Sequence, residues 1–156
     1  MLISLLILGN VALANPMPAG SIGMGAAIGA PSGIAGKMYI GDAFGVQFSA
    51  GGDLGRIGDV GLTADFVVHT STLNDPGDGY SLPLYIGGGV SASTNISELN
   101  GDTYFGPRAV MGIMIIVDGI PVDIYIETAP TLYVMGTQQS PISWGVDGQI
   151  GFRYYF

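Results

Sequence analysis

The sequence has no cysteine, one histidine and only four basic residues in 156 positions. Without cysteine, the chain cannot form a disulfide, use a catalytic thiol or bind a metal through thiolates. Four Lys and Arg against twelve Asp and Glu give a net charge of −8, so no basic surface for nucleic acid can be assembled. The same shortage leaves no polybasic segment to attract anionic lipid.

Charged residues of both signs are scarce. They make up 10% of the chain, against roughly 25% in soluble domains, while 48% of residues are hydrophobic and 27 are glycine. This balance indicates an outer surface that largely does not face water. No run of about 18 apolar residues free of charge, proline and dense glycine is present to form a transmembrane helix. The other structure that satisfies every backbone group in lipid is a closed β-barrel.

Glycine, proline, asparagine and aspartate clusters divide the chain into eight runs of alternating pattern, as short strands separated by turns would. Most runs have at least nine residues, enough for a tilted strand to cross a bilayer. We predict strands at 21–29, 33–41, 44–52, 60–70, 83–94, 104–117, 122–134 and 143–156. The predicted fold is therefore all-β, an eight-stranded antiparallel up-and-down transmembrane β-barrel over residues 15–156.

The connections should alternate between the two ends of such a barrel. We predict tight turns at 41–43 and 118–121 on the side of the termini, and outer loops at 51–59, 95–103 and 135–141. The connection 70–82 is long for a tight turn.

Residues 1–14 have the character of a secretion signal. An apolar stretch from Leu2 to Leu8 is followed by Ala12-Leu13-Ala14, a small-residue pattern that favours cleavage after Ala14. The usual basic start is missing. A buried N-terminal strand is the alternative, and the barrel prediction for the remaining chain is the same in either case.

Alternation assigns the two faces of each strand. One face is apolar in all eight runs and carries no charge. The other face carries three of the four basic residues and four carboxylates, with glycines such as Gly23 and Gly89 that leave space for larger neighbours. We predict an interior charge network of Lys37, Asp65, Arg108, Asp123, Glu127, Asp147 and Arg153. An apolar exterior around a polar interior is typical of an outer-membrane barrel.

Buried charges persist only when they are paired and hydrogen-bonded, and we expect Asp123 and Arg153 to lie together near the end with the termini. The interior of an eight-stranded barrel is just wide enough for side chains to fill. The network is therefore interpreted as a polar plug that fixes the barrel's register. A gated or narrow ion path along the same residues is the alternative.

The chain ends Phe152-Arg153-Tyr154-Tyr155-Phe156, which places three aromatic side chains on one strand face and Arg153 on the other. This ending resembles the C-terminal strand of bacterial outer-membrane β-barrels. Together with the eight alternating runs over residues 20–156, it is similar to small barrels of the outer-membrane protein A transmembrane-domain and outer-membrane protein X type.

The resemblance implies a location and partners. Phe152, Tyr154 and Phe156 would be the insertion signal read by the barrel-assembly machinery, and periplasmic chaperones would accompany the chain to the outer membrane of a Gram-negative-type bacterium, where it contacts lipid. No part of these 156 residues resembles the peptidoglycan-binding domain of outer-membrane protein A, so we do not expect the resemblance to extend to tethering to the cell wall.

His69 is the residue on which any histidine-based catalysis or histidine metal site must depend. Asp65 precedes it on the same strand face by about 13 Å, at roughly 3.3 Å per residue, too far to orient the ring. Ser71 or Ser91 would have to be the nucleophile, and nothing in the sequence favours either. Residues 75–79 lack the spacing of an EF-hand calcium loop. We predict no catalytic residue, metal or cofactor.

These observations lead to a non-enzymatic outer-membrane barrel with a structural or surface-interaction role. The alternatives are a narrow channel for ions or small solutes, and a soluble ligand-binding barrel of lipocalin type. The sequence does not predict the oligomeric state.

Overall fold

A computed structural model of the chain describes residues 17–54, 56–73, 78–96, 103–135 and 142–156. The predicted secretion signal, residues 1–14, lies outside them. In the described residues no helix is long and apolar enough to cross a membrane.

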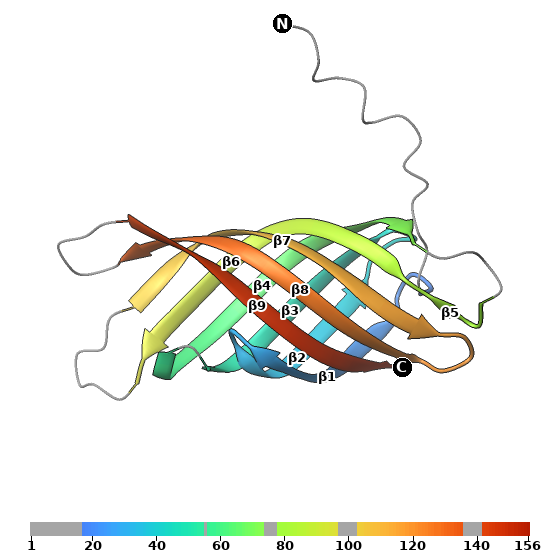
Figure 1. Cartoon of the computed structure of the whole chain (residues 1–156), viewed down its shortest axis with the longest axis horizontal. Coiled ribbons are helices and arrows are strands. Elements are labelled where there is room, and N and C mark those ends of the chain that lie inside the picture. Colours follow the sequence, from blue (N-terminus) through green and yellow to red (C-terminus); the bar gives the residue numbers. More distant parts are fainter. Residues whose placement is uncertain (1–16, 55, 74–77, 97–102, 136–141) are drawn as a thin grey trace, which may run out of the picture.

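The described residues form nine antiparallel strands in one sheet. The strands are β1 (Ile22–Gly29), β2 (Ser32–Tyr39), β3 (Phe44–Asp53), β4 (Arg56–Thr72), β5 (Tyr80–Ser81), β6 (Pro83–Asn95), β7 (Thr103–Val117), β8 (Val122–Met135) and β9 (Ile142–Tyr155). Neighbours follow the order β5-β7-β6-β4-β3-β2-β1-β9-β8, and β7 also pairs with β8, which closes the sheet into a barrel (Figure 1). The two-residue β5 pairs only with the end of β7, so the wall has eight long strands, as predicted.

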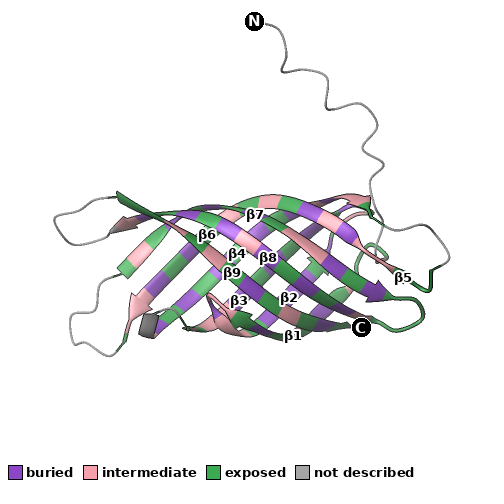
Figure 2. Ribbon diagram, in the orientation of Figure 1, coloured by how far each residue is buried: buried purple, intermediate pink, exposed green. Residues whose placement is uncertain are grey.

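Each strand alternates between a buried and an exposed face, which appears as stripes along every ribbon in Figure 2. In β3, Phe44 and Phe48 are 40% and 44% exposed, whereas Gln47 and Ser49 between and beside them are each 4% exposed. Polar side chains are buried and aromatic ones are exposed. The polar face of the alternating strand therefore points into the barrel and the apolar face points out.

Glycine on the inner face allows the wall to close tightly. A Cβ at Gly23 would lie 2.6 Å from the ring of Tyr155, and one at Gly25 would lie 1.8 Å from the carbonyl oxygen of Phe152. No other residue fits at either position without movement of a ring or of the backbone. The predicted role of inner-face glycines, to leave space for large neighbours, is confirmed at Gly23.

Two connections are shorter than predicted. The loop expected at 51–59 is mostly strand, because Gly51 and Gly52 pair with Gly61 and Val60 across β3 and β4, leaving only residues 54–55 between the strands. Similarly, β4 extends to Thr72 and β5 begins at Tyr80 within the expected connection 70–82. At Gly51 the neighbouring backbone leaves no room for a Cβ, so this glycine permits close packing inside a strand and does not form a turn.

The barrel has two distinct ends. The C-terminus, the β2–β3 and β7–β8 turns and the first described residues lie at one end, called here the terminal end (Figure 1). The β1–β2 and β3–β4 hairpins lie at the other, the loop end, where the Leu54 amide donates to the Gly29 carbonyl at 3.4 Å. The strands that flank the predicted outer loops at 95–103 and 135–141 end at the loop end, and most residues of these loops lie outside the described ones.

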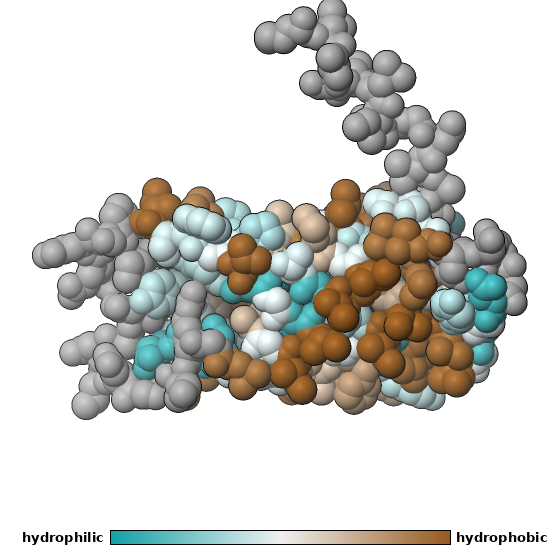
Figure 3. All heavy atoms as spheres, in the orientation of Figure 1, coloured by the Kyte–Doolittle hydropathy of each residue, from teal (hydrophilic) through white to brown (hydrophobic). Residues whose placement is uncertain are grey.

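The exterior of the wall is apolar. Of the outward side chains that the structure describes on the strands, none is charged. Figure 3 shows apolar side chains gathered over the half of the visible face nearest the terminal end, with paler residues toward the loop end.

Candidate functional site: the buried polar interior

The interior holds most of the described charged side chains of the strands. Lys37, Asp65, Arg108, Asp123, Glu127 and Arg153 are each at most 5% exposed, and Asp147 is half-buried. These six are three cations and three carboxylates, and a further carboxylate, Asp59 of β4, is buried at 6% exposure. They come from β2, β4, β7, β8 and β9, so the network joins strands around the whole barrel.

Asp123 and Arg153 form a pair near the terminal end. The guanidinium donates from Nε to Asp123 Oδ1 at 3.0 Å, and its Nη2 lies 3.0 Å from Oδ2. The Tyr155 hydroxyl donates to the same Oδ2, and the guanidinium stacks 4.0 Å from the centre of the Tyr125 ring. Adjacent strands bring them together, because Asp123 of β8 faces Arg153 of β9 in the ladder. This geometry pairs the two charges, although Arg153 Nη2 itself makes no hydrogen bond within the described residues.

Lys37 has a different environment from the one predicted. Its Nζ lies 2.9 Å from His69 Nε2 and 4.5 Å from the centre of the Tyr85 ring. His69 Nδ1 lies 3.0 Å from the Ala43 carbonyl oxygen, which can only accept, so Nδ1 carries the proton and Nε2 accepts from Lys37. Among the described residues, no carboxylate lies within ion-pair distance of Lys37.

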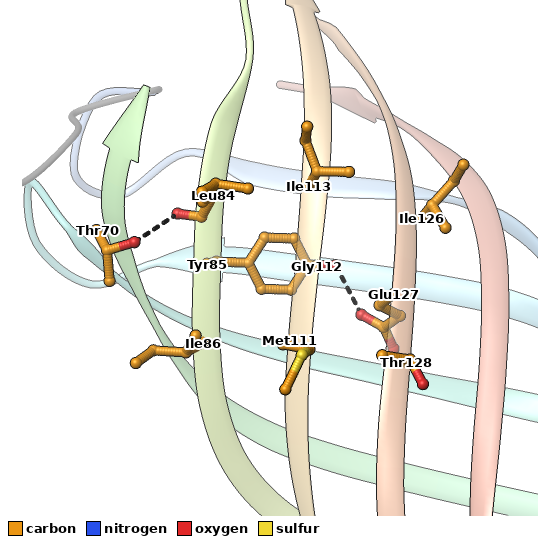
Figure 4. A pocket seen from close by; sticks show the side chains of 10 residues that line it. All are labelled: Thr70, Leu84, Tyr85, Ile86, Met111, Gly112, Ile113, Ile126, Glu127 and Thr128. Atoms are coloured by element: carbon orange, nitrogen blue, oxygen red, sulfur yellow. Dashed lines mark hydrogen bonds between the residues drawn. The ribbon is translucent and has the colours of Figure 1, made fainter. Parts of the chain in front are cut away.

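Glu127 is the centre of a second cluster halfway along the barrel. Its Oε2 accepts hydrogen bonds from Gln47 Nε2 and from the Tyr85 hydroxyl, both at 2.8 Å. The bond from Tyr85 is drawn in Figure 4. Its Oε1 lies 3.3 Å from Arg108 Nη2, and Arg108 Nε lies 3.2 Å from Asp65 Oδ1. Arg108 therefore bridges two carboxylates, which lowers the cost of burying all three charges.

A third cluster lies toward the loop end. Asp147 Oδ2 accepts hydrogen bonds from the hydroxyls of Thr131 and Tyr133, both at 2.7 Å. Gln149 donates from Nε2 to the carbonyl oxygen of Pro31 at 2.6 Å, so the β1–β2 turn is held across this end of the interior. No pattern in the sequence identified Pro31 as part of the site, because the turn's contact with β9 is set by the fold.

The interior side chains leave almost no free space. The cavity bordered by Gln47, Asp65, Glu127 and Arg153 has a volume of about 0 Å³, and the one beside Pro31 has about 10 Å³. A water molecule needs roughly 10–15 Å³. In this conformation the described residues therefore offer no continuous path for an ion.

The contacts of His69 bear on the catalytic alternative. Its ring contacts are Lys37, Ala43, Tyr39 at a centroid distance of 5.1 Å and Tyr85 at 5.9 Å. No serine or carboxylate is among them in the described part of the chain. The described residues also contain no group of three or more His, Asp or Glu side chains placed to hold a metal. The residues 75–79 considered for calcium lie partly outside the described ranges.

The three aromatic residues of the predicted insertion signal lie on the exterior. Phe152, Tyr154 and Phe156 are 53%, 48% and 79% exposed, and the rings of Tyr154 and Phe156 meet edge to face at 5.4 Å. Trp144, further along the same face of β9, is also 79% exposed.

Comparison with known proteins gives no assignment. No family model, no curated protein and no solved structure matches this chain.

Proposed function

We propose that this protein is an integral outer-membrane β-barrel whose polar interior is a structural plug, and that its role is structural or one of surface interaction and not catalytic. It would lie in the outer membrane of a Gram-negative-type bacterium, with the terminal end facing the periplasm. This orientation follows from the even number of long strands, which brings both ends of the barrel domain to one side.

The distribution of polarity around the wall carries this proposal. Outward side chains such as Leu62, Ile126 and Phe152 are 59%, 57% and 53% exposed, while the charges of the strands are sealed within. Water around such an exterior would be unfavourable at about 25 cal/mol per Å² of apolar surface. Lipid removes that cost, and a closed barrel leaves no edge strand unpaired in lipid.

A soluble ligand-binding barrel is supported less well by the same geometry. Such a barrel needs a polar exterior and an interior with room for a ligand. Here the exterior is apolar, and ion pairs fill the middle of the barrel. A channel would require the Arg108 ion pairs to open. Steady unitary currents of the parent protein in planar bilayers would contradict a plugged interior and support a narrow conducting path instead.

The proposal can be tested by placing one lysine on the wall and one at a turn. Leu62→Lys puts a charge in the outward face of β4, where a membrane barrel should lose roughly 2–4 kcal/mol. Ile120→Lys is the matched control, because Ile120 is 52% exposed in the β7–β8 turn. The measurement is the fraction of each variant that folds into liposomes, read as heat-modifiable migration on a gel.

We expect Leu62→Lys to lower the folded fraction in liposomes and Ile120→Lys to leave it unchanged. A soluble barrel would tolerate both lysines, because both side chains would face water. If both variants and the parent chain fold and remain soluble in buffer without detergent or lipid, the membrane assignment is wrong.

A further inference from the structure

The β7–β8 seam has gaps in its hydrogen-bond ladder. Phe105 pairs with Val134, Arg108 with Thr131 and Met111 with Thr128, but residues 106, 107, 109 and 110 have no partner in β8 within these described strands. In the other ladders between long strands, paired residues follow one another without such gaps, apart from one shift in register in β3–β4 and one in β4–β6.

Two prolines cause the gaps. Pro107 of β7 and Pro130 of β8 both face outward and are exposed, and the register places them opposite Leu132 and Ala109. Proline has no N–H, so the ladder lacks the two bonds that these positions would donate. The Leu132 carbonyl still points at β7, since a Cβ at Gly106 would lie 1.6 Å from its oxygen. The strands thus stay together with fewer bonds than elsewhere.

The outer surface is hollowed along the same seam. One hollow of about 380 Å³ is bordered by Pro107, Ala109, Pro130, Leu132 and Trp144. The proline rings and the Ala109 methyl group project only a short distance from the wall and form the floor of this hollow. The longer side chains of Leu132 and Trp144 form its border.

A second hollow, of about 460 Å³, lies further along the same seam toward the terminal end. It lies over Met111–Ile113 of β7 and residues 126–128 of β8, and Leu84 and Ile86 of β6 border it (Figure 4). We name the two hollows together the β7–β8 groove. It covers residues 107–113, or about 20 Å of strand at ~3.3 Å per residue.

The chemistry of the groove favours an apolar occupant. Its outward side chains are aliphatic, aromatic, proline or threonine, and none is charged. The charges behind the wall are already engaged: Glu127 accepts from Tyr85 and Gln47 and pairs with Arg108. Nothing in the described groove therefore selects a charged or strongly polar ligand.

The dimensions of the groove fit a chain of methylene groups. Strands of such barrels tilt by about 35–45° from the membrane normal, so 20 Å of strand covers roughly 15 Å of depth. That is about half of the ~30 Å hydrocarbon core, a length that one acyl chain can follow. The groove is also continuous with the apolar exterior that lipid would cover.

We propose that the β7–β8 groove retains one acyl chain of a membrane lipid, held longer than the lipid around the rest of the barrel. This inference rests on the proposed membrane location. A second copy of the chain seated in the groove is the competing occupant and is an outcome of the test.

Trp144 provides a direct reporter, because it borders the groove and is the only tryptophan in the chain. The probe is a phosphatidylcholine with dibrominated acyl chains, which quenches tryptophan on contact. The protein is folded in liposomes of this lipid and then extracted into detergent. We expect strong quenching in the liposomes and part of it to persist in detergent, with about one brominated lipid per protein by mass spectrometry.

Filling the groove should release the lipid. Ala109→Phe places a ring on the groove floor, and Ala26→Phe places the same ring on the outward face of β1, away from the groove. We expect the quenching that persists in detergent to be lost in Ala109→Phe and kept in Ala26→Phe. Heat-modifiable migration shows that each variant is folded.

The outcomes separate this inference from the proposed function. Absence of quenching in fully brominated liposomes contradicts the membrane location itself. Full quenching in liposomes with none retained in detergent, or equal retention by both phenylalanine variants, contradicts the groove alone. A dimer in detergent that Ala109→Phe dissociates, with no retained lipid, assigns the groove to a second copy and overturns the lipid proposal.

Discussion

Arg153 and Lys37 are both sealed inside the barrel at 1% exposure, yet their surroundings differ. Arg153 has a carboxylate, Asp123, within 3.0 Å. Lys37 has a histidine nitrogen and the faces of tyrosine rings. When one member of a buried ion pair is removed, the other charge remains buried without a partner, which destabilises the fold. When a buried cation has no anion beside it, its removal mainly eliminates the cost of burying that cation.

We therefore expect Arg153→Ala to destabilise the barrel by about 3–5 kcal/mol, the usual cost of breaking a buried pair by removing one side. The measurement is the urea midpoint of unfolding in liposomes. In the double variant with Asp123→Ala the cost should be less than the sum of the two single costs, because neither charge is left alone.

Lys37→Met is the contrasting substitution, since it keeps the length of the side chain and removes the charge. Its cost should be under about 1.5 kcal/mol, as for a shape-conserving core replacement. An unchanged urea midpoint for Arg153→Ala, or a larger loss for Lys37→Met than for Arg153→Ala, would contradict this assignment of roles.

At the scale of the elements, β7 and β8 are the unusual pair. Proline in the middle of a sheet is normally confined to edges and bulges because it cannot donate to the ladder. Pro107 and Pro130 nevertheless lie in strands that are paired on both sides. Because these two side chains are short, they leave the outer hollow beside Trp144. The missing ladder hydrogen bonds and the hollow therefore lie at the same place.

Restoring a donor should strengthen this seam. Pro130→Val adds an N–H opposite the Ala109 carbonyl and a side chain that suits a strand, and we expect a gain of about 1 kcal/mol, the net worth of one hydrogen bond. Ala64→Val on β4 adds similar outward bulk without a new donor. Equal urea midpoints for the two variants would mean that the missing bond has no effect on stability.

At the scale of the whole molecule, closure of the barrel depends on β9, which pairs with β1 on one side and β8 on the other. Its outward residues run from Trp144 near the loop end to Phe156 at the terminal end, and both are 79% exposed. Their equal exposure in the closed barrel means that folded-state burial does not distinguish them. A role as an insertion signal would distinguish them during assembly.

We expect Phe156→Ala to reduce the yield of barrel assembled by the barrel-assembly machinery in reconstituted liposomes, while the urea midpoint of the assembled protein stays close to that of the parent. Trp144→Ala is the control, because it removes an equally exposed aromatic ring from the same strand face. If both variants assemble with the parent's yield, the terminal aromatic residues are not an insertion signal.

The sequence by itself determined the all-β class, the eight long strands and the face of each outward or inward residue. These depend on a local alternation of period two, which Phe44, Gln47 and Phe48 of β3 illustrate. Turn positions near glycine were predicted less well: Gly51 and Gly52 lie within β3, and at Gly51 the neighbouring backbone leaves no room for a Cβ.

Only the tertiary structure decided which interior groups meet. Gln47 reaches Glu127 across 80 positions of sequence, and Gln149 reaches the Pro31 carbonyl across 118. Such contacts depend on how the closed sheet staggers its strands, which sets the depth of each side chain. For that reason the alternation could place Lys37 inside the barrel but could not show that its partner is His69.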